Sequence, residues 1–180
     1  MQTLDVVRDS LGRVHELIPA ILDGLTGDDL LWRPDAEANP IGWLVWHLTR
    51  VEDDHLAHLG GIEQAWTADG WYSRFGLPYL KNAHGFRMTA VEVGAFNVTQ
   101  TSLLNGYAAA TWAQTQAVLS SLDEERLDEV VDERYTPPVT VGVRLVSVMV
   151  ETAQHIGQAG YVRGLRERSR GINSGWAGTA

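Results

Sequence analysis

The segment NPIGWLVWHLTRVEDDHLAHLGG, residues 39–61, carries the signals of one α-helix from its first residue to its last. Asn39 is a favoured N-cap residue and Pro40 a favoured first helical residue. Gly60 and Gly61 are typical of a helix end. Apolar residues between these ends recur at the spacing of one helical face, at Ile41, Leu44, Leu48 and Val51. The pattern predicts a helix over residues 40–59.

Three further segments show the same helical period on either side of this one, over residues 3–25, 98–122 and 141–168. The last of them begins with many β-branched residues, which also suit a strand, but its length favours a helix. Four long helices predict an all-α protein, a four-helix bundle, folded as a single domain over residues 1–180. Residues 61–96 show no sustained period and are predicted to be a long ordered loop with one short helix at most. So long a connection between the second and third helices predicts a crossover.

Composition excludes several classes of protein. The net charge of −9 argues against a nucleic-acid partner, because binding to phosphates depends on Lys and Arg. The 180 residues include no Cys, so disulfides, a thiolate nucleophile and Cys-ligated metals are excluded. The N-terminus has no signal-peptide pattern, and no apolar run reaches the roughly 20 residues of a membrane span. We therefore expect no membrane partner and a cytoplasmic location.

The best candidate for chemistry is a divalent-metal site. Glu151 and His155 are four residues apart, so they lie one turn apart on the same face of the last predicted helix. A third ligand must come from another helix, and His47, beside the apolar face of residues 40–59, is the best supplier. Two imidazoles and one carboxylate suit Zn, Ni, Mn or Fe(II), with coordination positions open for water or substrate. The alternative is a surface ion pair of Glu151 with His155 and a hydrogen-bonded core histidine at position 47.

The same helix offers a rival cluster, Asp54, His55 and His58. Asp54 and His58 lie within about 20° of His47 around the helix axis, but seven and eleven residues separate them from it along the chain. One helix cannot wrap an ion over that length, so Asp54 or His55 is interpreted as a partner that orients His47 or as an ordinary helix contact. His15 and His84 are expected to be structural or exposed, and Trp43 and Trp46 are expected to be packing residues rather than a binding platform.

The stretches LWRPDAEANPIGWLVWHLTRVEDDHL (residues 31–56) and VTVGVRLVSVMVETAQHIGQAGYVRGL (residues 139–165) resemble the DinB-like superfamily, damage-inducible four-helix bundles that include mycothiol- and bacillithiol-dependent enzymes. The resemblance implies a metal-binding histidine at His47 and a His-x3-His pair ending at His155. Glu151 stands where the first histidine of that pair is commonest. It remains a usable ligand but leaves the metal's identity open.

The resemblance also implies a function. We expect a metal-dependent, thiol-dependent S-transferase or isomerase that acts on a small-molecule substrate, with mycothiol or a related low-molecular-weight thiol as cosubstrate. A metal ion would lower the pKa of that thiol. The resemblance further implies a homodimer. Two alternatives stay open: a metal-dependent hydrolase that uses the same three ligands, and a non-catalytic, stress-related bundle that binds a ligand.

Overall fold

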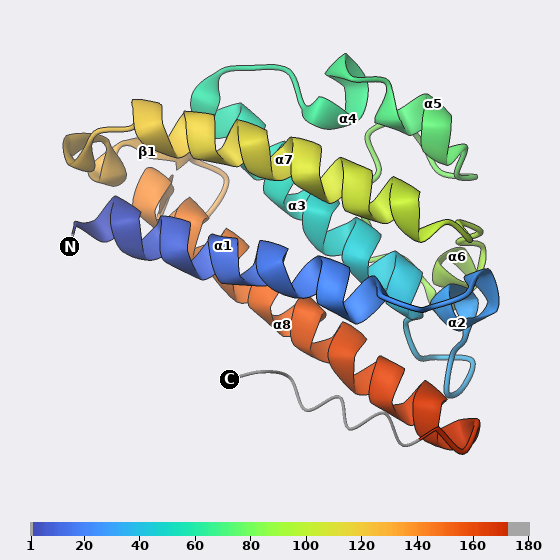
Figure 1. The fold of residues 1–180 in the computed structure, drawn as a ribbon. Coiled ribbons are helices and arrows are strands. Elements are labelled where there is room, and N and C mark those ends of the chain that lie inside the picture. The colour runs from blue at the N-terminus through green and yellow to red at the C-terminus, as the bar shows by residue number, and fades with distance from the viewer. Residues whose placement is uncertain (1, 173–180) are drawn as a thin grey trace.

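The computed structural model describes residues 2–172. Most of them belong to four long helices (Figure 1): α1 (Thr3–Leu22), α3 (Ile41–Gly60), α7 (Thr101–Ser121) and α8 (Val141–Ser169). Helices α1 and α3 each pack against both α7 and α8, so α1 lies diagonally across the bundle from α3. The predicted all-α fold is confirmed.

Helix directions explain the long connection between α3 and α7. These two helices run in the same direction, and α1 and α8 run in the opposite one (Figure 1). The chain must therefore return along the length of the bundle before α7 begins, which is the predicted crossover. The return path contains three short helices rather than one at most: α4 (Ala65–Ala68), α5 (Trp71–Phe75) and α6 (Ala90–Gly94).

Helix α3 is the most enclosed of the four long helices, since α7 and α8 cover two of its faces and the return path covers a third. Even its polar residues Thr49, Arg50, Glu52 and Asp53 are buried. The expected N-cap at Asn39 is wrong: Pro40 is the N-cap residue, and it makes no side-chain cap hydrogen bond. Gly61 ends the helix as predicted, in the left-handed conformation with φ 62°.

Two other predicted boundaries differ from the structure. Helix α1 ends at Leu22 rather than near Leu25, because the chain turns through Gly24 at φ 69°. The following connector contains a short helix, α2 (Gly27–Leu31), whose first turn is capped by Thr26, which accepts a hydrogen bond from the Asp29 amide. The β-branched start of the last helix does form helix, from Val141 onward.

A small antiparallel sheet precedes α8. The helical turn η1 (Glu124–Asp128) leads into β1 (Val130–Asp132), which pairs with β2 (Val139–Thr140) through Val130 with Thr140 and Asp132 with Val139. This sheet places Asp132 beside the first turns of α8. No helix among residues 2–172 is long and apolar enough to cross a membrane.

Buried polar groups tie the return path to α3. The Asp53 carboxylate accepts hydrogen bonds from the Ala65 and Trp66 amides, at 2.9 and 2.8 Å. Arg50 Nε donates to the Ala83 carbonyl at 3.2 Å, and Trp66 Nε1 donates to the Lys81 carbonyl at 2.9 Å. These bonds satisfy polar groups that are costly to bury unpaired. They also fix the chain just before His84, over the middle of α3.

A second buried polar cluster joins three of the long helices. His15 of α1 lies with Nε2 2.9 Å from Glu52 Oε2 of α3, and Thr115 of α7 donates to Glu52 Oε1 at 2.6 Å. The His15 ring stacks on Trp112, with ring centroids 4.9 Å apart. His15 is therefore part of the core rather than exposed.

Candidate metal centre

The structure brings His47, Glu151 and His155 together between α3 and α8. Their ligand atoms all lie within 4.8 Å of one another. His47 Nε2 and His155 Nε2 are each 3.2 Å from the same atom, Glu151 Oε1. The three residues therefore form one cluster, and Glu151 is not limited to a surface pair with His155.

Each imidazole is held by its other nitrogen. His47 Nδ1 donates to the backbone carbonyl of His84, and His155 Nδ1 donates to Gln158 Oε1 at 2.8 Å. A carbonyl oxygen only accepts, so the Nδ1 atom that faces each oxygen carries a ring proton. Outer partners of this kind fix the tautomer and orientation of histidines that bind metals. Both Nε2 atoms are left facing Glu151.

Electrostatics favours a cation at that point. Burial lowers the pKa of His47 below its ordinary value of 6.5, so this ring is neutral at pH 7. A neutral Nε2 lone pair 3.2 Å from a carboxylate oxygen is repulsive unless a proton or a cation lies near both. A divalent cation that accepts all three lone pairs relieves this repulsion. The donor set, two imidazole nitrogens and one carboxylate oxygen, suits Zn, Ni, Mn or Fe(II).

Access to the cluster is from one side. The side chains of His47, His155 and Glu151 are 4%, 14% and 32% exposed. The ring of Trp43 stacks on His47 with centroids 4.7 Å apart and lies edge-on to His155 at 6.4 Å. His47 thus forms the floor and Glu151 the rim that solvent reaches.

Sequence reasoning missed two residues that hold His47 in place. His84 was expected only to be structural or exposed, and its backbone carbonyl proves to orient the His47 ring. Gly85 follows at φ 99°, where an added Cβ would collide with His47 Nδ1 and come within 3.0 Å of the Trp43 ring. Only glycine lets the return path pass this close to the ring. No local pattern marks Gly85 among the other glycines of this connection.

The rival cluster lies elsewhere. Asp54, His55 and His58 do not join the metal cluster and instead line a separate cavity of about 540 Å³. Asp54 accepts a hydrogen bond from the Gln64 amide at 2.7 Å. Burial, followed by the nearby Arg144, lowers the pKa of His55 to about 4. The interpretation of these residues as ordinary helix contacts fits better than an orienting role, since none of them touches His47.

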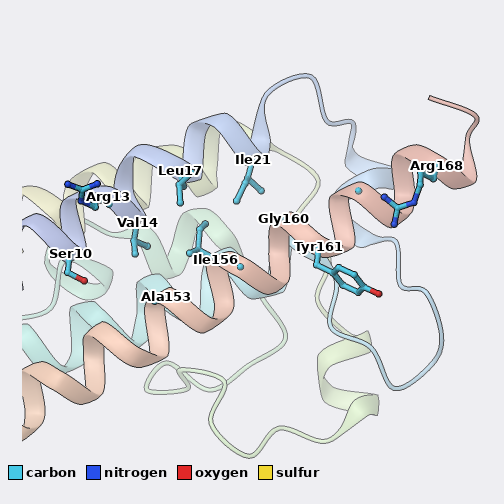
Figure 2. A pocket seen from close by; sticks show the side chains of 12 residues that line it. Ser10, Arg13, Val14, Leu17, Ile21, Ala153, Ile156, Gly160, Tyr161 and Arg168 are labelled. Carbon is cyan, nitrogen blue, oxygen red and sulfur yellow. The ribbon is translucent and has the colours of Figure 1, made fainter. Parts of the chain in front are cut away.

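A larger cavity, of about 710 Å³, lies on the opposite face of α8. Val14, Leu17 and Ile21 of α1 form one wall, and Ile156 and Gly160 of α8 form the other (Figure 2). No residue of the metal cluster lines it. Like the cavity beside Asp54, this larger cavity therefore lies outside the metal cluster.

Comparison with known proteins supports the fold. A family model for the DinB superfamily matches residues 10–159, a span that contains all three ligand residues. The crystal structure of a conserved protein from Enterococcus faecalis is similar to this chain, with 32% sequence identity and a TM-score of 0.85. That similarity covers 92% of this chain and 97% of the other. None of the curated proteins matches.

Proposed function

The chain belongs to the DinB superfamily, and from this premise we propose that it is a metal-dependent enzyme, a thiol-dependent S-transferase or isomerase acting on a small electrophile. One observation carries the proposal: two imidazole Nε2 atoms converge on Glu151 Oε1, with both Nδ1 atoms already engaged. His47, Glu151 and His155 would hold the cation. A divalent metal bound there would supply Lewis-acid chemistry, which lowers the pKa of a thiol or a water molecule.

The residues of the chain define what else the site can do. The protein contains no Cys, so a thiol nucleophile must come from a cosubstrate. The Trp43 ring shields the His47 side from water, while the exposed rim at Glu151 admits a small molecule. Both histidines use Nδ1 to maintain orientation, so neither carries a free second nitrogen for proton transfer. Glu151 or solvent would therefore accept the proton of the incoming thiol.

The test has two parts. Protein purified without chelator or a metal-affinity tag should contain a first-row divalent metal, and His155→Ala should lose it. Conjugation of mycothiol with a panel of electrophiles should then require the metal. His58→Ala is the matched control for metal content, because this histidine lies on α3 outside the ligand cluster. Turnover without added thiol would identify a hydrolase instead. Metal-free protein that gains no thermal stability from Zn or Ni would contradict the proposal.

We also propose that the chain forms a homodimer through the face of α1 and α8 that carries the larger cavity. The first half of this α8 face bears exposed Val143, Val146 and Val150, and the second half bears Gly157 and Gly164. In an antiparallel two-fold pairing of α8 with a second copy, Val150 would meet Gly157 and Val143 would meet Gly164. Both pairs are symmetric about the same point of the helix, as a self-complementary interface requires.

The dimer is tested by light scattering. We expect about twice the chain mass of 19.8 kDa, and a reduction to one chain mass in Val150→Asp. Val91→Asp, on the exposed surface of α6, should leave the mass unchanged. A single chain mass for the unaltered protein would contradict the proposal.

A further inference from the structure

Residues of α3 and α8 help to line the polar cavity of about 540 Å³, and the same two helices carry the metal cluster. Asp54 follows His47 by seven residues on α3, and Arg144 precedes Glu151 by seven on α8. The two helices run in opposite directions (Figure 1), so both displacements point to the same end of the bundle. Seven residues of helix span about 10 Å. The cavity is therefore about two helical turns from the metal cluster, measured along both helices.

One wall of this cavity, called here the Arg144 cavity, has a surplus of positive charge. Asp132 accepts hydrogen bonds from Arg134 Nε at 2.9 Å, from Arg134 Nη2 at 2.8 Å and from Arg144 Nη2 at 3.1 Å. Two guanidinium groups thus share a single carboxylate. Arg144 Nε is buried and has no hydrogen-bond partner among the described residues. An arginine donor of this kind is a ready site for an oxygen ligand.

The rest of the lining sets the charge of that ligand. His55 Nε2 lies 3.5 Å from Arg144 Nη1, and the low pKa of His55, about 4, leaves it uncharged at pH 7. Asp54 contributes a negative charge beyond His55, 3.6 Å from His55 Nδ1. Counted with Asp54, the lining is neutral, with two arginines against two aspartates. The one positive charge in excess lies at the wall of Arg134, Arg144 and Asp132, on the far side of His55 from Asp54. A carboxylate bound at that wall brings one negative charge, whereas a phosphate dianion brings two and is repelled more strongly by Asp54.

We infer that the Arg144 cavity binds the carboxylate of a small molecule whose other end, a thiol in the proposed reaction, reaches the metal cluster about 10 Å away. Arg144 and Arg134 are the residues that recognise this group. The inference rests on the proposed function for the metal end of the substrate. It narrows the substrate class to molecules that carry a carboxylate at that distance from the reacting atom.

The experiment measures binding at the metal cluster separately from binding at the Arg144 cavity. Protein loaded with Co²⁺ is titrated with 8-mercaptooctanoate and, in parallel, with 8-mercapto-octan-1-ol, which has the same chain without the carboxylate. The charge-transfer absorption of a cobalt thiolate reports binding at the metal end of both probes. A charge-assisted hydrogen bond to Arg144 should make the acid bind about tenfold tighter than the alcohol.

Variants assign that preference to the cavity. Arg144→Gln should remove the tenfold preference and still show the cobalt–thiolate band with both probes. Arg144→Lys keeps the charge beside Asp132 but loses the Nε donor, so most of the preference should disappear. If the Arg144 variants do not fold, Arg134→Gln tests the same preference for the acid, because the Arg134 side chain is 82% exposed and its replacement is tolerated more easily. Arg8→Gln, on α1, is the control that should retain the full preference.

The outcomes are distinct. Equal affinity for acid and alcohol, together with a normal band, would overturn the inference and leave the proposed metal site standing. A preference for the acid that survives Arg144→Gln and Arg134→Gln would also overturn it, because the carboxylate would then bind elsewhere. Absence of Co²⁺ binding and of any band would refute the metal site and this inference with it.

Discussion

Replacing Gly85 by alanine tests whether the return path holds His47 in its ligand orientation. Gly85 has φ 99°, and its α-carbon faces the edge of the His47 ring. A left-handed conformation costs an L-residue about 1–2 kcal/mol. The added Cβ would also collide with His47 Nδ1 and press on the Trp43 ring at 3.0 Å, and overpacking of this kind adds about 1–3 kcal/mol. We expect Gly85→Ala to lose about 2–5 kcal/mol of unfolding free energy.

The larger effect should be on metal binding. To accept the new methyl group, the His47 ring must leave the His84 carbonyl or tilt away from Glu151 and His155. Loss of an outer partner of a metal-binding histidine lowers metal affinity by about 10–100-fold. Calorimetric titration with Zn²⁺ measures the affinity, and urea denaturation without metal measures the free energy of unfolding.

Gly70→Ala is the matched control. Gly70 lies on the same return path at φ 72°, and a Cβ built there meets nothing within 4 Å. This variant should lose only the cost of the left-handed backbone, about 1–2 kcal/mol, and bind Zn²⁺ with unchanged affinity. If the two variants bound Zn²⁺ equally well, the return path would not be orienting His47.

Three further predictions concern the ligands and the neighbouring cavity. His47→Ala and His155→Ala should each remove most of the thermal stabilisation by Zn²⁺, and the double variant should lose little more. The effects of substituting two residues that share one ion are not additive. If the two effects simply added, the residues would not share an ion. Glu151→His should retain or strengthen Ni²⁺ or Zn²⁺ binding in a metal titration, and weaker binding would show that position 151 does not face the ion. The pKa of His55 is about 4 in the folded chain and 6.5 as the ordinary value. The folded state favours the neutral His55 ring, so protonation of this ring destabilises the folded chain. The contribution of neutral His55 to the free energy of unfolding is therefore complete above pH 6.5 and is lost as the pH falls toward 4, by at most about 3 kcal/mol. Urea denaturation at pH 7.5 and 4.5 should show this loss in the unaltered protein and a smaller one in His55→Asn.

The four long helices were predictable because each buries one continuous face, and a period of 3.6 residues records that face in the sequence. The short helices α4, α5 and α6 were not, since four or five residues are too few to show a period. Their positions depend on contacts with α3 that the local sequence does not contain, such as the hydrogen bonds of Asp53 with the Ala65 and Trp66 amides. The expected N-cap at Asn39 failed because the chain enters α3 through Pro40 instead.

The ligand cluster was partly predictable for a similar reason. Glu151 and His155 are neighbours on one helix, so their spacing alone places them together. His47 was chosen over Asp54, His55 and His58 because it lies beside the apolar face of its helix and because one helix cannot wrap an ion with residues so far apart along it. The resemblance to known bundles then strengthened that choice. The roles of His84 and Gly85 could not be predicted, since they arise only when a distant loop folds back over α3.

The ligand residues stand on α3 and α8, which pack against each other along their length and share a core of apolar side chains. The scaffold is therefore ordered before any ion arrives, unlike small zinc domains in which binding free energy is consumed by folding. A preformed site uses its whole intrinsic affinity for the ion, so one ligand can be exchanged without unfolding the protein. If His47, Glu151 and His155 hold an ion, position 151 can change between carboxylate and imidazole, and so alter which metal binds, while the architecture stays the same.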